Sequence, residues 1–385
     1  MKIALDLTPL MRVETGVDRY LLNLVQALAV ADQENEYLLL VNPGDQDRLP
    51  DLDRSRWSVV PVHARSRWRR LVFQQFGLPR RLRREGVEVL HSPSFLLPLR
   101  APGLQQVLSV HDITFFTEPQ VHNRVRRSCW FRWLVAHSID RADHIVVPSG
   151  WVKDTLLRFR RSRDPATVHV VEHGLDPRFR DAVQQAAGTA PRAPGLPRDY
   201  ILFVGTLEPR KNLLRLVEAY RSLLQGGFDW HLVLAGQWGW QMSELQRTLK
   251  YPELAGRVHV TGYLPHDELL RVYTGAGMLV YPSLAEGFGF PPLEAMALGV
   301  PVIVSNSSAL GELYGDAALT VEPTDVPGMA SAIRRLAADP AVREDCRRRG
   351  LELARRFTWE KAALRTLAVY RTAYRSGAGN IPRNP

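Results

Sequence analysis

The residues best suited to chemistry are two glutamates, Glu286 and Glu294, on either side of a turn that contains Gly287 and Gly289. Glycine allows backbone conformations that point several N–H groups to one side of a tight loop. The prolines at 291–292 suit the first turn of a helix, whose open N–H groups and dipole favour a phosphate or a sugar. The sequence therefore predicts a binding site at this helix start, where each carboxylate addresses a different part of one ligand.

Each glutamate also has an ordinary explanation, because Glu286 could be a solvated loop residue and Glu294 a charge that favours the helix dipole. The surrounding segment favours the functional interpretation. Residues 286–303, EGFGFPPLEAMALGVPVI, resemble the donor-sugar signature of retaining glycosyltransferases of family 4. The resemblance implies an α/β protein with the GT-B fold, in which two Rossmann-like domains face across a cleft.

The resemblance also implies a role for each residue of this segment. Glu294 would bind the ribose of a nucleotide diphosphate sugar, and Glu286 would bind the hydroxyls of the donor sugar. The N–H groups of Gly287, Phe288 and Gly289 would lie against the sugar and the phosphates. The family retains the anomeric configuration by a front-face mechanism, in which the leaving phosphate helps to take the acceptor proton. GDP-mannose is the first expected donor, followed by a deoxyhexose donor such as rhamnose.

A second candidate loop, residues 205–212 (GTLEPRKN), follows a buried strand and contains Arg210 and Lys211. It lacks the second glycine and the Lys-Ser/Thr pair of a P-loop. It resembles the diphosphate-binding loop of the family, although Thr206 stands where an arginine often follows the glycine. Two cations at a helix start can stabilise a leaving diphosphate, and a solvated pair is the alternative. With these two cations, no divalent metal and no other cofactor is expected.

His111 follows a short predicted strand, and the carboxyl end of a parallel strand is where such sheets bind ligands. The segment SVHDITFF is similar to the HD segment of the mannosyl- and rhamnosyltransferase-like branch, which places this histidine beside the transferring sugar carbon. Asp112 would either orient the ring or cap the next helix. Gly16 matches a glycine that the family places beside the donor phosphates, and an ordinary turn glycine is an equal alternative.

The composition is that of a soluble globular chain with two domains, with 385 residues, 45% hydrophobic and 23% charged. Cys129 and Cys346 lack metal-ligand spacing and fit a reducing compartment. No run of eighteen apolar residues predicts a membrane span, and MKIALDLTPLM is typical of a first strand rather than a signal peptide. We therefore expect a bacterial cytoplasmic enzyme, whose net charge of +10 favours an anionic partner.

The succession of strand, turn and helix occurs twice, which predicts one Rossmann-like unit in each half. We expect an acceptor-side domain over residues 1–190 and a nucleotide-sugar domain over residues 198–357. A segment rich in Ala, Pro and Gly at 186–198 is the predicted linker. A terminal helix at 358–375 is expected to pack on the first domain, and 376–385 to be disordered.

Residues 65–84 contain eight arginines interleaved with apolar side chains. A solvated helix face explains this pattern, and so does a basic surface that contacts anionic lipid through Arg80, Arg81, Arg83 and Arg84. Nucleic acid comes third, because no recognised binding module accompanies the charge. Many members of the family act on lipid-linked glycans, so the hypothesis is peripheral contact with the inner face of the cytoplasmic membrane.

Two further basic stretches are predicted to be helical, at 124–137 and 334–356. The first contains Trp130, Phe131 and Trp133, which we expect in the core rather than at a membrane interface.

Other functions remain open at this point. A nucleotide-sugar epimerase or a phosphorylase could use the same fold, and so could a catalytically idle relative that binds membrane or nucleic acid. The triplet Asp51-Leu52-Asp53 formally matches the D-x-D of metal-dependent sugar transferases with a different fold. It lies in a polar, proline-flanked stretch and is interpreted as solvated surface.

Overall fold

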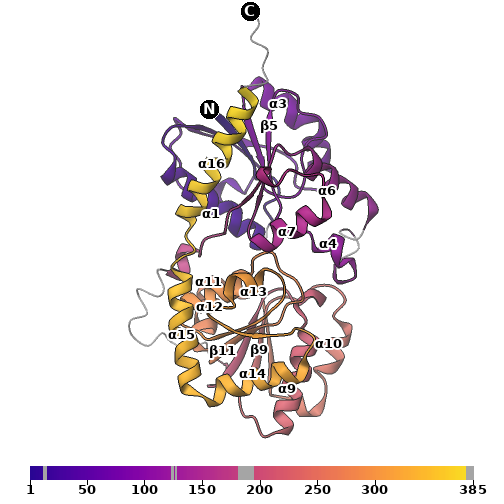
Figure 1. Cartoon of the computed structure of the whole chain (residues 1–385), viewed down its shortest axis with the longest axis vertical. Coiled ribbons are helices and arrows are strands. Elements are labelled where there is room, and N and C mark those ends of the chain that lie inside the picture. The colour runs from indigo at the N-terminus through magenta and orange to yellow at the C-terminus, as the bar shows by residue number, and fades with distance from the viewer. Residues whose placement is uncertain (12–14, 123–124, 126–127, 181–194, 379–385) are drawn as a thin grey trace, which may run out of the picture. The chain divides into compact units, whose positions relative to one another are not determined.

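The computed structural model describes residues 1–11, 15–122, 125, 128–180 and 195–378 (Figure 1). The chain divides into two compact units, each built on a parallel sheet. The first unit comprises Met1–Phe116, Val125–Gly174 and Thr358–Pro385, and the second comprises Thr117–Arg124 and Leu175–Phe357. The two Rossmann-like units predicted from the sequence are confirmed.

Within the described residues, the first unit has a seven-stranded sheet in the order β3-β2-β1-β4-β5-β6-β7. Its strands are β1 (Lys2–Asp6), β2 (Glu36–Val41), β3 (Trp57–Pro61), β4 (Val89–Ser92), β5 (Gln105–Ser109), β6 (His144–Val147) and β7 (Val168–Val170). Most are short Val-, Leu- and Ile-rich runs that are almost fully buried, as expected for parallel strands covered by helices. The helices of this part of the chain are α1 (Gly16–Ala31), α2 (Arg67–Val72), α3 (Leu78–Arg84), α4 (Thr114–Thr117), α6 (Cys129–Arg141) and α7 (Gly150–Phe159).

The second unit has six strands in its described part, in the order β10-β9-β8-β11-β12-β13. They are β8 (Tyr200–Val204), β9 (His231–Ala235), β10 (Val258–Gly262), β11 (Met278–Tyr281), β12 (Val302–Ser305) and β13 (Leu319–Val321). The helices are α9 (Leu213–Gln225), α10 (Ser243–Thr248), α11 (His266–Gly275), α12 (Phe290–Ala297), α13 (Ser308–Tyr314), α14 (Val326–Ala338) and α15 (Pro340–Ala354).

The strand order of each sheet reverses beside its first strand, and this reversal positions the candidate residues. Strand β1 pairs with β2 on one side and with β4 on the other. Strand β8 likewise pairs with both β9 and β11. Parallel α/β sheets bind ligands at the carboxyl ends of the strands at such a switch point. In the second unit, the loops that leave this point are residues 205–212 after β8 and 282–289 after β11.

The chain leaves and re-enters the first unit at neighbouring positions. A Cβ added to Gly174 would lie 2.2 Å from the backbone nitrogen of Trp359, so only glycine fits this close approach. The final helix, α16 (Trp359–Ala378), belongs to the first unit and lies beside α1, where it is drawn in yellow (Figure 1). It extends beyond the expected end at residue 375, and the expected disordered tail lies outside the described residues from 379 onward.

The boundaries differ from the predicted ones in two places. The division between the units falls after Gly174 rather than at residue 190, and the predicted linker at 186–198 lies outside the described residues up to 194. The single helix expected over 334–356 is two helices, because Pro340 has no N–H and cannot continue α14. Asp339 ends α14 and caps α15, since its side chain accepts hydrogen bonds from two backbone N–H groups.

The placement of the tryptophans in α6 differs from the prediction. Trp130 is 49% exposed and Trp133 is 55% exposed, whereas Leu134 is buried. The buried face of α6 begins with Leu134, so Trp130 lies in the first turn ahead of it and Trp133 on the outer side. Among the described residues, no helix combines the length and the apolar character that crossing a membrane requires.

Candidate functional site

Arg210 and Glu286 meet where the loops after β8 and β11 come together. The guanidinium Nη1 donates to Glu286 Oε2 at 2.5 Å and to the carbonyl of Ala285 at 2.8 Å. Its Nε and Nη2 donate to Glu208 Oε1 at 3.1 and 2.8 Å. Glu208 and Glu286 are each only 6% exposed. Arg210 is therefore fixed between two buried carboxylates.

Lys211 extends the same network toward the sheet. Its Nζ donates to Glu286 Oε1 and to the hydroxyl of Tyr281, both at 2.6 Å. Tyr281 is the last residue of β11, and its hydroxyl lies 3.3 Å from Glu286 Oε1. Lys211 is 7% exposed. Two cations and two carboxylates thus balance in a buried cluster, which here comprises Glu208, Arg210, Lys211 and Glu286.

The charges of this cluster determine its protonation. Burial raises the pKa of Glu286, but Arg210 and Lys211 oppose it more strongly and lower that pKa to about 2. Burial lowers the pKa of Lys211, and the neighbouring Glu286 carboxylate opposes this effect. Burial and the same carboxylate raise the pKa of Tyr281 well above its usual value. Glu286 is consequently an acceptor at neutral pH, and Tyr281 keeps the proton with which it donates.

Glu294 lies in a separate network. It is 1% exposed, and its Oε2 accepts a hydrogen bond from the hydroxyl of Tyr273 in α11 at 2.7 Å. The buried ring of Tyr273 packs edge-on against Phe179, with ring centroids 5.7 Å apart. These contacts fix the position of the Glu294 carboxylate. The solvated-loop, dipole-charge and solvated-pair explanations of the glutamates and cations are therefore wrong, whereas their donor-binding roles stay predictions.

The turn between the glutamates is shaped mainly by one of its two glycines. Gly289 has φ +89° and is the N-cap residue of α12, and a Cβ there would lie 2.7 Å from the side chain of Leu310. Gly287 does not have a positive φ, so the expected special conformation applies to Gly289 alone. Phe288 is buried, with its ring edge-on to Phe290 and Phe357. The turn is thus held by packing as well as by its backbone.

In the first unit, His111 lies just beyond β5, as predicted. Its Nε2 is 2.9 Å from the carbonyl oxygen of Pro93. A carbonyl only accepts, so Nε2 carries a proton, and Nδ1 can act as an acceptor whenever the ring is neutral. The ring lies edge-on to Tyr20, with centroids 4.7 Å apart, and 5.6 Å from His173. Burial and the charge of His111 lower the pKa of His173 well below its usual value.

A buried chain of hydrogen bonds supports Tyr20 from behind. The hydroxyls of Tyr20 and Ser109 are 2.9 Å apart, and Ser109 Oγ lies 2.7 Å from His91 Nε2. His91 Nδ1 lies 2.6 Å from the hydroxyl of Tyr370 in α16. Burial, with a smaller effect of His111, lowers the pKa of His91 to about 3. The terminal helix is therefore linked through neutral groups to the ring that packs on His111.

The remaining candidates of the first unit lie near turns. Gly16 is the first residue of α1, and Thr15 caps this helix reciprocally with Asp18. The carboxylate of Asp112 accepts hydrogen bonds from the backbone N–H and the hydroxyl of Thr114, the first residue of α4, which agrees with the helix-cap alternative, and the ring-orienting alternative stays a prediction. Neither observation tests the predicted contact of Gly16 with donor phosphates.

The D-x-D triplet has local partners. Asp53 accepts hydrogen bonds from Ser55 and Arg56, and its side chain is 49% exposed. In the part of the chain that the structure describes, no group of three or more His, Cys, Asp or Glu residues has the arrangement of a metal site. A reaction without a divalent metal remains a prediction.

Sequence reasoning missed the residues that hold the predicted ones in place. Glu208, Tyr273, Tyr281 and His173 each contact a candidate residue directly. Tyr281 had a usable signal, because it ends a buried strand next to the glycine turn. Tyr273 had none, since it lies in a different helix from Glu294 and meets it only through tertiary packing.

Comparison with known proteins identifies the family. The family model "Glycosyltransferase Family 4" matches residues 15–179, and the model "Glycosyl transferases group 1" matches residues 191–352. The O-antigen chain mannosyltransferase B of Escherichia coli is 32% identical over 395 residues, covering 96% of this chain and 100% of its own. The chain belongs to glycosyltransferase family 4.

Solved structures agree on the fold of this glycosyltransferase. Sucrose-phosphate synthase from Thermosynechococcus elongatus aligns with a TM-score of 0.75 at 23% identity, over 97% of this chain and 99% of that one. An Anabaena protein, Alr3699/HepE, whose structure was solved with UDP-glucose, aligns with a TM-score of 0.68 at 16% identity, over 97% and 99%. The fold is GT-B, as the resemblance implied.

Proposed function

We propose that this glycosyltransferase transfers a hexose, with mannose as the first candidate, from a nucleotide diphosphate sugar to a hydroxyl of a glycan or lipid-linked acceptor. The single observation that carries the proposal is the buried cluster at the switch point of the second sheet. The UDP-glucose complex of the Anabaena protein supports a nucleotide sugar as the donor. The name of the Escherichia coli relative supports mannose, and GDP-mannose is therefore the first donor to test.

Within this proposal, the two glutamates bind different parts of the donor. A carboxylate has about four acceptor positions. Glu286 uses three of them for Arg210, Lys211 and Tyr281, which leaves capacity for a sugar hydroxyl. Glu294 is assigned to the ribose, because Tyr273 holds its carboxylate rigidly and a fixed acceptor suits a hydroxyl pair. The backbone from Gly287 to Gly289 is assigned to the sugar and the phosphates.

Arg210 and Lys211 are assigned to the leaving diphosphate. An ammonium group has three N–H donors, and two of those of Lys211 are directed at Tyr281 and Glu286. The third is assigned to a phosphate oxygen, where it would stabilise the charge that grows as the glycosidic bond breaks. The cluster is neutral without donor, so binding a diphosphate adds negative charge next to cations that are already positioned.

The proposed reaction retains the configuration of the sugar. The bond from the anomeric carbon to the diphosphate breaks, and a bond to the acceptor oxygen forms on the same face. The acceptor proton passes to an oxygen of the departing phosphate, so the protein needs no separate base. His111 is assigned to the sugar near the reacting carbon, and its Nδ1 would accept a hydrogen bond from a sugar hydroxyl.

The direct test combines binding with product analysis. GDP-mannose, a deoxyhexose donor such as dTDP-rhamnose, and UDP-glucose are compared by thermal shift, since a donor that binds only the folded state raises its melting temperature. The stabilising donor is then incubated with and without a mannose-terminated oligosaccharide, and the linkage is read by NMR. Transfer with retention supports the proposal. Donor consumption without acceptor would indicate an epimerase or a hydrolase instead.

The expected independence from metal is tested in the same assay. Because Arg210 and Lys211 supply the positive charge, activity should be unchanged within about twofold in excess EDTA. Loss of activity in EDTA that manganese or magnesium restores would refute this part of the proposal.

A further inference from the structure

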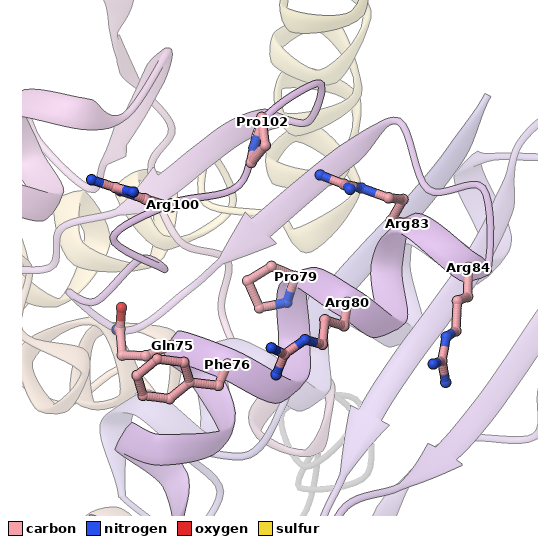
Figure 2. Close-up of a pocket in the computed structure, with 8 residues that line it drawn as sticks. All are labelled: Gln75, Phe76, Pro79, Arg80, Arg83, Arg84, Arg100 and Pro102. Atoms are coloured by element: carbon pink, nitrogen blue, oxygen red, sulfur yellow. The ribbon is translucent and has the colours of Figure 1, made fainter.

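A hollow of about 350 Å³ opens on the first unit, beside the helical run that joins α2 to α3. Figure 2 shows that Arg80 and Arg83 extend from α3 at this hollow, and that Arg100 extends from the loop between β4 and β5. Phe76 lies beside Arg80, and Arg84 lies at the margin. No acidic residue is among those that line the hollow. Its wall is therefore strongly positive.

These arginines are available to an external anion. Arg80, Arg83, Arg84 and Arg100 are exposed, and no ion pair joins any of them to a residue that the structure describes. Arg81 differs, because its guanidinium lies 3.6 Å from Glu85 and does not line the hollow. Of the four arginines that the sequence suggested for membrane contact, Arg81 is therefore not part of the hollow. Arg100, which the sequence did not suggest, belongs to it instead.

An apolar band lies next to the hollow. Trp68, Val72 and Phe76 are 72%, 56% and 62% exposed, and they recur at every fourth residue of a continuous helical run. The ring of Trp68 contacts that of Trp130 from α6, with centroids 5.9 Å apart, and Trp133 is exposed one turn further along. Large side chains exposed together in this way mark an interaction surface.

We propose that the hollow binds the phosphate of an anionic lipid headgroup while the apolar band enters the interface of the same membrane. The planar guanidinium group of arginine can donate two parallel hydrogen bonds to a phosphate, and it stays charged at every physiological pH. Tryptophan and phenylalanine favour the boundary between headgroups and acyl chains. The lipid is identified by charge and amphipathic character together, because a free phosphate would make no use of the exposed band. The proposal does not depend on the identity of the sugar donor.

The test is flotation of the purified full-length protein with vesicles of phosphatidylcholine alone or with 30% phosphatidylglycerol, at about 50 and 500 mM salt. The hollow variant carries Arg80→Ser, Arg83→Ser and Arg100→Ser. Its matched control carries Arg54→Ser, Arg161→Ser and Arg247→Ser, which remove the same charge from exposed positions elsewhere. Circular dichroism melting confirms that both variants fold.

The wild type and the control should float with anionic vesicles at low salt and much less at high salt, because salt screens such attraction. The hollow variant should bind at least tenfold more weakly, since each basic residue near an anionic surface contributes about fivefold. Equal loss in both variants would mean that only net charge matters and would overturn the proposed site. Absence of wild-type flotation at low salt would overturn the membrane contact altogether.

Two further arms separate the other occupants. Trp68→Ser with Trp130→Ser should reduce flotation at least threefold while leaving its salt dependence intact, and no reduction would remove the apolar band from the proposal. Inorganic phosphate and a single-stranded oligonucleotide are each added, without vesicles, to the wild type and to the hollow variant. If either binds in a manner that the hollow variant abolishes, and vesicles do not bind, the occupant is not a lipid and the proposal fails.

Discussion

Arginines occupy two opposite environments in this glycosyltransferase. Arg210 lies between two buried carboxylates in the second unit, with a hydrogen bond to each. Arg80, Arg83 and Arg100 line an exposed hollow in the first unit and have no ion pair within the described residues. A buried cation needs a nearby anionic group of the same protein, whereas an exposed cation is solvated by water and remains accessible to an external anion. The comparison separates charges that are positioned for chemistry from charges that are available for docking.

The largest effect should come from breaking the compensated pair. Glu286→Gln leaves Arg210 and Lys211 with one carboxylate instead of two and removes the proposed acceptor for the sugar. We expect turnover to fall about 10³-fold, roughly 4 kcal/mol of barrier, as measured by initial rates at saturating donor. The matched change Glu244→Gln, at an exposed position of the same unit, should leave the rate within twofold. A loss of turnover below tenfold in Glu286→Gln would contradict a role of Glu286 in the reaction.

A smaller effect is expected from the lysine of the cluster. Lys211→Ala should lower kcat more than tenfold, about 1.4 kcal/mol of barrier, with little change in the KM for donor, because the diphosphate charge grows as the bond breaks. Lys250→Ala serves as an exposed control. Tyr281→Phe, which removes one hydrogen bond from Lys211, should lower kcat only a few-fold. A change confined to KM would assign Lys211 to ground-state binding.

Glu294 should affect binding rather than turnover. Its proposed ribose contact exists in ground and transition states alike, so Glu294→Gln should raise the KM for donor about tenfold and leave kcat nearly unchanged. Tyr273→Phe removes one hydrogen bond to the carboxylate and should raise that KM two- to threefold. An unchanged KM in Glu294→Gln would contradict the ribose assignment.

The sequence contained most of the fold and part of the site, for identifiable physical reasons. Parallel strands are continuous apolar runs, so the buried strand before residues 205–212, which is β8, could be predicted, and the loop after it followed. That this loop meets the one after β11 depends on strand order, which a single sequence does not display. Tyr273 was missed because it meets Glu294 only through tertiary packing. Glu208 lies in the predicted loop, two residues before Arg210, and a single sequence does not show that its carboxylate turns back onto that guanidinium. The exposure of Trp130 was missed because an aromatic residue in the first turn of a helix can lie on either side of the core boundary.

The smallest expected effect is on the pH dependence of the unfolding free energy, which should differ between the two arginine environments. Glu286 has a folded-state pKa of about 2, below its ordinary value near 4.5. Its ionised form therefore stabilises the fold fully above about pH 4.5, and this contribution is lost as the pH falls toward 2. The difference in unfolding free energy between wild type and Glu286→Gln should be constant from pH 6 to 8 and fall by more than half at pH 3.

Urea denaturation at pH 3, 6 and 8 measures this difference. The hollow variant Arg80→Ser, Arg83→Ser and Arg100→Ser is the counterpart, since its arginines have no titrating partner in the described structure. Its small stability difference from wild type should be flat over the same range. If the two variants showed the same pH dependence of stability, the net charge of the whole protein would explain it. The result would then contradict a specific stabilisation of the fold by the ion pairs of Glu286 with Arg210 and Lys211.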